Sequence, residues 1–174
     1  SVTLDKGVQD GELEESLVRS KADAIVFDDK LAPLIKKIRD NGKTQIKNYI
    51  CMDDSEEFDC VSKILEKGQK LLDKGNKDFI ENTIDENALN ILLFTSGTTS
   101  KSKVVMLTQK NIACDIYALQ LVEDIRSTDR NICFLPFHHI FGSTYMIMML
   151  ACGVMTAFPD GLRYIKQNMN EYHV

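Results

Sequence analysis

Short apolar runs alternate with segments of helical periodicity along all 174 residues of the chain. The apolar runs predict strands at 22–29, 46–51, 90–95, 103–107, 131–135 and 153–158. The periodic segments predict helices at 11–21, 30–43, 56–75, 109–123 and 143–152, with a further helix beginning near residue 161. Because strands that alternate with helices form mainly parallel sheets, we expect an α/β fold whose sheet is flanked by helices.

Several residues indicate where the predicted helices begin and end. Pro33 falls in the first turn of the helix at 30–43, and Gly42 lies at its end. Thr108 and Ser143 are expected to cap the N-termini of the helices that follow them. The continuous apolar character of 22–29 predicts a strand that is buried on both faces.

Charge divides the chain into two unequal halves. Residues 1–90 hold 14 Lys and Arg against 20 Asp and Glu, whereas residues 91–174 hold 7 against 6. The acidic first half argues against nucleic-acid binding as the main task. We expect an acidic α/β unit at 1–75, a polar connector at 76–89 and a second α/β unit at 90–174.

Neither a membrane span nor a cysteine-based site is expected. The longest apolar run, 146–158, is shorter than the roughly 18 residues of a transmembrane helix. The N-terminus lacks the basic and apolar regions of a signal peptide. The five cysteines, at 51, 60, 114, 133 and 152, form no C-x-x-C pair, so their spacing predicts neither a zinc site nor a redox pair. Reduced, buried thiols in the cytoplasm are expected instead.

The stretch 94–103, FTSGTTSKSK, follows the predicted strand at 90–95 directly. Ligands of parallel sheets bind beyond the carboxyl ends of the strands, which is where this stretch lies. A phosphate site needs a bendable backbone, as at Gly97, a cation such as Lys101 or Lys103, and hydroxyl donors. The hydroxyls would come from Thr95, Ser96, Thr98 and Thr99. The same composition also suits a solvated hairpin loop, so the residues alone leave both readings open.

Two other motifs share features with this stretch. A Walker loop requires a second glycine where Ser102 stands, and a helix where a strand is predicted, so that reading fails. Ser100 and Lys103 satisfy the S-x-x-K pattern of serine hydrolases and acyltransferases. No K-T-G segment follows, which leaves a serine enzyme as a secondary alternative.

The longer string FTSGTTSKSKVVMLT resembles the phosphate-loop signature of the acyl-adenylate-forming enzymes, Y/F-T-S-G-T-T-G-x-P-K-G-V, with the signature lysine at Lys103. A second segment, FLPFHHIFG at 134–142, resembles the LPLFHIFG motif of the same family. Pro136, His139 and Gly142 fall on its motif positions, and the PFHHIFG form looks most like long-chain fatty acyl-CoA ligases. The resemblance extends over essentially the whole chain.

This resemblance implies part of the large N-terminal domain of an acyl-CoA synthetase, which uses ATP and Mg²⁺ to make an acyl-adenylate and transfers the acyl group to coenzyme A. The implied nucleotide-binding residues are Thr95, Ser96, Gly97, Thr98, Thr99 and Lys103, and His139 would lie near the acyl pocket. No catalytic residue or metal ligand is expected within 1–174, so these residues alone should be inactive. The implied partners are a carboxylate, ATP and coenzyme A, with possible self-association of the lobe and peripheral membrane association of the parent.

The stretch also departs from the family signature. Ser100, Ser102 and Val104 replace both family glycines and the proline after T-S-G-T-T. If position 100 requires a positive φ, serine costs about 1 kcal/mol there. A catalytically inactive nucleotide-binding relative is therefore a second alternative.

Overall fold

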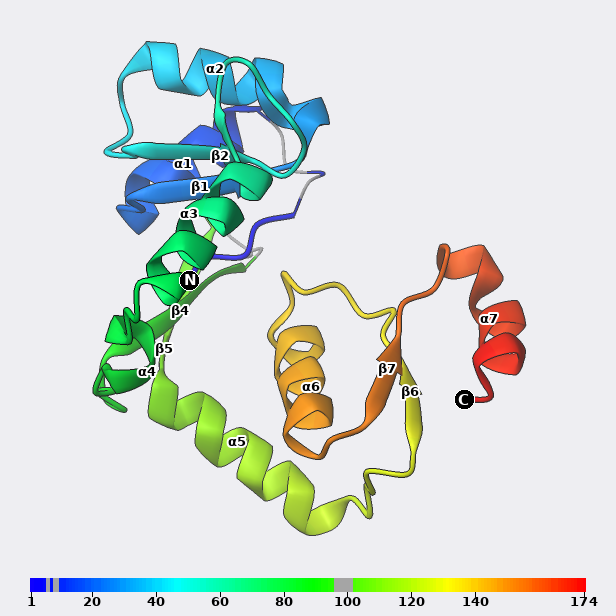
Figure 1. Cartoon of the computed structure of the whole chain (residues 1–174). Helices are drawn as coiled ribbons and strands as arrows, with labels where there is room; N and C mark the ends of the chain where they lie inside the picture. Colours follow the sequence, from blue (N-terminus) through cyan, green and yellow to red (C-terminus); the bar gives the residue numbers. More distant parts are fainter. Residues whose placement is uncertain (6, 8–9, 96–101) are drawn as a thin grey trace. The chain divides into compact units, whose positions relative to one another are not determined.

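The computed structural model describes residues 1–5, 7, 10–95 and 102–174 of the chain (Figure 1). The chain divides into two compact units, one formed by Ser1–Asp5 and Asp85–Val174 and the other by Lys6–Ile84. The division into 1–75, 76–89 and 90–174 stays a prediction. None of the helices in the described ranges is long and apolar enough to cross a membrane.

The unit of residues 6–84 is built on a three-stranded parallel sheet in the order β1-β2-β3. Its strands are β1 (Ala24–Phe27), β2 (Asn48–Cys51) and β3 (Asp59–Cys60). Its helices are α1 (Asp10–Ser20), η1 (Asp29–Leu31), α2 (Ala32–Asn41), α3 (Val61–Asp73) and α4 (Asp78–Glu81). The ends of α2 follow the prediction, with Pro33 in its first turn and Gly42 in the left-handed conformation at its C-cap.

The core of this unit lies between the sheet and the helices α1 and α2. Phe27 packs edge-on against Phe58, with ring centroids 5.1 Å apart. Its buried apolar residues are Leu13, Leu17, Phe27, Ile35, Ile38, Ile46, Cys51, Phe58 and Cys60.

Two predictions for this unit are wrong. β1 is not buried on both faces, because Val26 is 57% exposed while its neighbour Phe27 is 3% exposed. The helix expected at 56–75 begins only at Val61, and the two-residue strand β3 precedes it. Phe58 lies just before β3 and outside α3, although its spacing from Val61 suits a helix.

The second unit begins with an antiparallel hairpin of β4 (Leu89–Thr95) and β5 (Lys103–Thr108), followed by α5 (Gln109–Val122). Next come β6 (Arg130–Ile132), α6 (Ile140–Ala151) and β7 (Met155–Ala157), with β6 and β7 paired in parallel. The chain then forms η2 (Leu162–Tyr164) and α7 (Ile165–Tyr172). The expectation of parallel pairing therefore holds for β1–β3 and β6–β7, whereas the hairpin is antiparallel.

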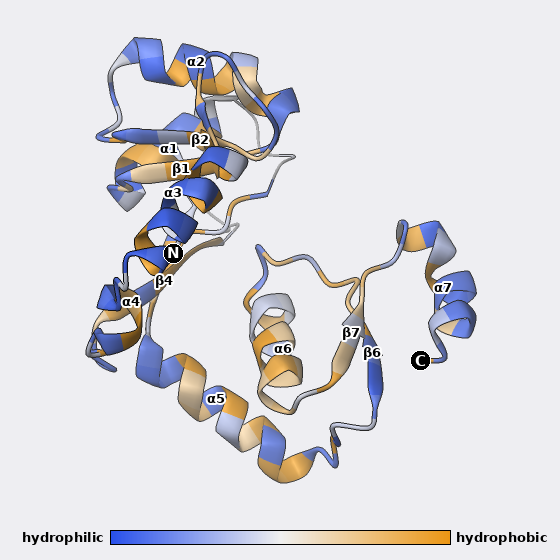
Figure 2. Ribbon diagram, in the orientation of Figure 1, coloured by the Kyte–Doolittle hydropathy of each residue, from blue (hydrophilic) through white to orange (hydrophobic). Residues whose placement is uncertain are grey.

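Helices α5 and α6 supply the core of the second unit. Figure 2 shows apolar residues along much of α6, and its Met148 and Met149 are fully buried beside Val154. The N-terminal segment also belongs to this unit, because Val2 bridges Leu92 of β4 in parallel. β4 is thus flanked by β5 and by the segment 1–5.

Candidate functional site

The candidate site is the end of the β4–β5 hairpin where Thr95 and Lys103 flank the connecting loop; the hairpin is drawn in green in Figure 1. Thr95, the last residue of β4, pairs with Lys103, the first residue of β5. Both side chains are exposed, and cross-strand partners of an antiparallel pair point to the same face of the sheet. The structure therefore brings together a hydroxyl and an ammonium group at the base of the loop.

The other predicted loop residues, Ser96, Gly97, Thr98 and Thr99, lie outside the described residues, as do Ser100 and Lys101. What the structure establishes is how the two ends of this stretch are held. Six residue pairs from Leu89↔Thr108 to Thr95↔Lys103 align the strands, with one irregularity between Leu89 and Ile91. The ends of the loop are consequently fixed next to each other by backbone pairing.

Buried apolar side chains hold the hairpin from one side. Ile91 and Leu93 of β4 pack with Ile112 of α5, and Leu107, Ile116 and Ile140 complete the cluster. Alternate residues of a strand share a face, so Thr95 follows Ile91 and Leu93 on the face that carries this cluster. Ile140 is the first residue of α6, which places the start of α6 on the same face as Thr95 and Lys103.

The direction in which α5 leaves the hairpin is set at Thr108. As predicted, Thr108 is the N-cap of α5, and its hydroxyl accepts a hydrogen bond from the Asn111 amide at 3.2 Å. The Asn111 side chain accepts one in return from the Thr108 amide at 2.9 Å. This capping box joins the end of β5 directly to α5.

The segment 134–142 forms a tight turn that begins α6. The His139 amide donates to the Pro136 carbonyl at 3.1 Å, and a Cβ added at Gly142 would lie 2.5 Å from that same oxygen. Position 142 therefore accepts only glycine without a backbone shift. The three motif positions Pro136, His139 and Gly142 thus share one local contact.

His139 is the N-cap residue of α6 and is exposed. The expectation that Ser143 caps this helix is wrong, because α6 begins at Ile140 and Ser143 lies within its first turn. The Ser143 hydroxyl instead donates to the Ile140 carbonyl at 3.0 Å. The helix starts early because the turn at Pro136 already directs the chain into it.

The neighbouring His138 has a partner that sequence reasoning missed. Its Nε2 lies 3.7 Å from Oδ2 of Asp5, and its ring lies 4.5 Å from that of His139. Asp5 belongs to the segment beside β4, far away in sequence. No local sequence pattern predicts this contact, since it depends on the pairing of the N-terminal segment with β4.

Lys103 begins β5, and its side chain is exposed. Among the residues that the structure describes, no carboxylate forms an ion pair with its ammonium group. Lys110, on α5 of the same unit, differs in this respect because its ammonium group lies 3.1 Å from Oε1 of Glu86. A cation that has no carboxylate partner among the described residues, and that lies beside a hydroxyl, suits phosphate oxygens, so Thr95 and Lys103 fit the ATP that the resemblance implies.

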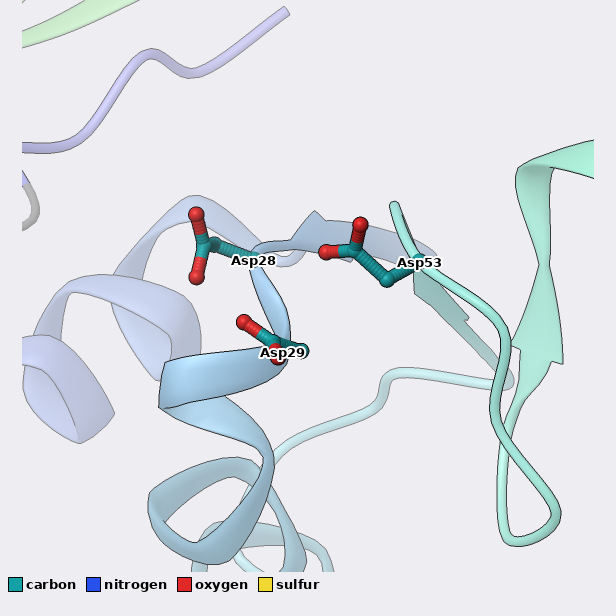
Figure 3. A group of neighbouring side chains, drawn as sticks. All are labelled: Asp28, Asp29 and Asp53. Carbon is teal, nitrogen blue, oxygen red and sulfur yellow. The ribbon is translucent and has the colours of Figure 1, made fainter.

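A group of three carboxylates lies in the other unit, at the carboxyl ends of β1 and β2. Oxygen atoms of Asp28, Asp29 and Asp53 lie within 4.8 Å of one another, and Figure 3 shows the three side chains as neighbours. All three are exposed. The Asp28 carboxylate caps η1 by accepting a hydrogen bond from the Lys30 backbone amide at 3.0 Å. Exposed carboxylates of this kind commonly hold no ion, and we assign no metal site to them.

The geometry defines a hairpin whose last described pair, Thr95 and Lys103, lies on the face that also carries the start of α6. The sequence profile of the AMP-binding enzyme family matches residues 1–174, and the chain belongs to this family.

Two of the individual relatives are CoA ligases. The chain is 28% identical over 142 residues to the 3-methylmercaptopropionyl-CoA ligase of Ruegeria lacuscaerulensis, covering 78% of this chain and 26% of that protein. It is 30% identical over 125 residues to 4-coumarate–CoA ligase 2 of Petroselinum crispum, covering 69% of this chain and 21% of that protein. The chain thus spans about a quarter of the length of these relatives.

A solved structure confirms the predicted fold. The long-chain-fatty-acid-CoA ligase of Archaeoglobus fulgidus superposes with a TM-score of 0.79 at 21% identity, covering 99% of this chain and 33% of that one. At this identity the likeness concerns the fold alone.

Proposed function

We propose that the whole protein is an ATP-dependent acid–thiol ligase that activates a carboxylate as an acyl-adenylate and transfers the acyl group to coenzyme A. The observation that carries this proposal is the hairpin, in which a T-S-G-T-T stretch runs between the paired residues Thr95 and Lys103. Membership of the AMP-binding family and the CoA-ligase relatives support it.

The hairpin answers a problem of charge. A carboxylate that attacks the α-phosphate of ATP must approach a polyanion, so the phosphates need to be neutralised and held. In this proposal the Lys103 ammonium group supplies the positive charge, and Thr95, Ser96, Thr98 and Thr99 donate hydroxyl hydrogen bonds. Gly97 lets the backbone amides approach the phosphates closely. Mg²⁺ would supply further neutralisation through ligands outside residues 1–174.

His139 is proposed to lie at the acyl side of the site. Its support is positional, because α6 begins on the face of the hairpin that carries Thr95 and Lys103. An exposed imidazole at a helix N-cap has a ring free to contact a bound acyl group. Residues 1–174 alone remain predicted to be inactive.

Lys103→Ala in the whole protein tests the phosphate role. We expect ATP–pyrophosphate exchange to fall roughly a hundredfold, the order seen when one charge-stabilising group is removed from an active site. The matched control is Lys110→Ala, which removes a lysine of the same unit that is already paired with Glu86 and should leave exchange near the wild-type rate. Equal losses in both variants would refute the assignment. ATP binding without any exchange would instead indicate an inactive relative.

The acyl substrate is proposed to be a long-chain fatty acid, on the basis of the PFHHIFG form of residues 136–142. The relatives supply the competitors, since their names specify 3-methylmercaptopropionate and 4-coumarate. CoA-thioester formation with these two acids and with a series of fatty acids decides the question. Faster turnover of either competitor than of any long-chain acid would overturn the substrate, while leaving the ligase reaction intact.

The cytoplasm remains the proposed location of the protein. Its support is the cysteine pattern of the sequence, in which no C-x-x-C pair occurs.

A further inference from the structure

The parallel sheet of the unit 6–84 brings two cysteines together. Cys51 ends β2 and Cys60 ends β3, and the two are register partners. Each is 1% exposed. Register partners on neighbouring strands point to the same face and have backbones about 4.8 Å apart. That spacing falls within the roughly 4.4–6.8 Å between Cα atoms that a disulfide requires.

The spacing of these cysteines in the sequence does not indicate a redox pair, because redox motifs are recognised as C-x-x-C. Here strand pairing across the β2–β3 connection places the thiols side by side instead. The missed signal is therefore the strand β3, which the helical periodicity of 56–75 concealed.

The surroundings of Cys60 favour its thiolate. Cys60 is the N-cap residue of α3, and its Sγ lies 3.1 Å from the Ser62 hydroxyl. The Ser62 hydroxyl lowers the pKa of Cys60 most, and the Lys63 backbone amide and ammonium group lower it further. Burial of the thiol opposes them by raising this pKa, and the Asp54 carboxylate raises it to a smaller extent. Ser62 also lies 3.1 Å from Asp54 Oδ1, so two acceptors compete for one hydroxyl proton.

A half-open pocket borders Cys60. Its volume is about 360 Å³, and it is lined by Asp54, Ser55, Glu56, Cys60 and Lys63. A water molecule occupies about 30 Å³ in the liquid, so the pocket has room for hydrogen peroxide, which is little larger. Cys60 thus combines a perturbed thiol, an adjacent cavity and a second thiol in register.

We propose that Cys60 and Cys51 form a peroxide-sensitive thiol pair, in which hydrogen peroxide oxidises Cys60 and Cys51 then closes a disulfide between β2 and β3. In the first step the Cys60 thiolate attacks one peroxide oxygen, the O–O bond breaks, hydroxide leaves, and Cys60 becomes a sulfenic acid. In the second step the Cys51 thiol attacks that sulfur, an S–S bond forms, the S–O bond breaks, and water leaves with the thiol proton. Peroxide takes up two electrons and the two thiols lose them.

This site lies in a different unit from the hairpin, and it does not depend on the proposed ligase activity. Its product would tie the carboxyl end of β2 to the residue that precedes α3.

The test is limited oxidation of the purified protein with hydrogen peroxide, followed by alkylation, trypsin digestion and mass spectrometry. Both cysteines fall in one tryptic peptide, residues 48–63. We expect this peptide to become lighter by two hydrogen atoms before the exposed Cys114 or the buried Cys133 is modified. Earlier oxidation of Cys114, or gain of oxygen on Cys51 or Cys60 without loss of hydrogen, would refute the pair. Fragment-ion spectra of the peptide separate oxygen on Met52, which lies in the same peptide, from oxygen on either cysteine.

Serine variants separate the roles of the two thiols. In Cys51→Ser, Cys60 should accumulate as a sulfenic acid that dimedone traps. In Cys60→Ser, Cys51 should stay reduced at the same peroxide dose. Oxidation of Cys51 at an unchanged rate in Cys60→Ser would contradict Cys60 as the first site of attack. Circular dichroism of each variant confirms that the fold is retained.

Two substitutions near Cys60 should act in opposite directions. Ser62→Ala removes the hydroxyl that favours the thiolate and should slow disulfide formation severalfold, because the thiolate fraction changes by up to about tenfold for each unit of pKa. Asp54→Asn removes the opposing charge and should accelerate it. Unchanged rates in both variants, or the reverse order, would show that the thiolate of Cys60 does not control the reaction.

Discussion

Gly142 shows how one missing side chain shapes the candidate site. The chain doubles back so closely that the Pro136 carbonyl oxygen occupies the space of a Cβ at position 142. The same oxygen accepts a hydrogen bond from the His139 backbone amide, and this turn directs the chain into α6. Close packing therefore explains the proline and the glycine of the family motif. The histidine of the motif is instead exposed.

Gly142→Ala should destabilise the protein by about 1–3 kcal/mol, because the new methyl group meets a backbone atom that cannot rotate away. Gly68→Ala is the matched contrast, since a Cβ there has nothing within 4 Å. Position 68 lies inside α3, so alanine should stabilise the helix by about 0.5–1 kcal/mol. Urea denaturation of both variants provides the measurement. A neutral Gly142→Ala would mean that the turn at Pro136 relaxes easily.

At the scale of single elements, the capping box of α5 transmits the geometry of the hairpin to the helix behind it. Thr108 ends β5 and caps α5, so its hydrogen bonds serve both elements. Thr108→Ala should cost about 1 kcal/mol of stability, while Thr108→Ser keeps the acceptor oxygen and should cost much less. Thermal unfolding of the two variants compares these costs. If serine proved as damaging as alanine, the methyl group rather than the cap would be responsible.

The start of α5 was predictable because its signal is local: a β-strand, a threonine and then a helical pattern. The start of α6 was not, because Ser143 looks like a cap in sequence while the chain has already turned at Pro136. β3 escaped prediction for a related reason, since a two-residue strand has too few residues to show a period. The position of such a short strand is set by the strand with which it pairs.

The candidate site follows the same rule. The hydroxyls and Lys103 could be identified from composition and motif, because a phosphate site concentrates such residues in one stretch. The contact between Asp5 and His138 could not, since the two residues are brought together only by pairing of the segment 1–5 with β4. The pairing of Cys51 with Cys60 likewise depends on strand register.

For the molecule as a whole, two glutamates of the unit 6–84 have pKa values that folding lowers. In the unit 6–84, hydrogen bonds from Lys36 and Arg39 lower the pKa of Glu57. Those from Asn41 and Lys43 lower the pKa of Glu14. Both carboxylates thereby accept hydrogen bonds from side chains on α2 or just beyond its end. The charged form of each glutamate is favoured in the folded state.

The unit 6–84 should therefore lose stability in acid. A carboxylate whose pKa is lowered by folding stabilises the folded state above its unfolded pKa of about 4.3, and this contribution disappears as the pH falls through the lower folded value. The free energy of opening in this unit can be measured by amide hydrogen exchange, corrected for the intrinsic exchange rates. We expect this free energy to decrease as the pH falls from about 5 to about 3. Glu57→Gln should reduce that dependence, whereas Glu56→Gln should preserve it, because Glu56 has no ion pair among the described contacts. A pH dependence that survives in Glu57→Gln combined with Glu14→Gln would show that other groups govern acid unfolding.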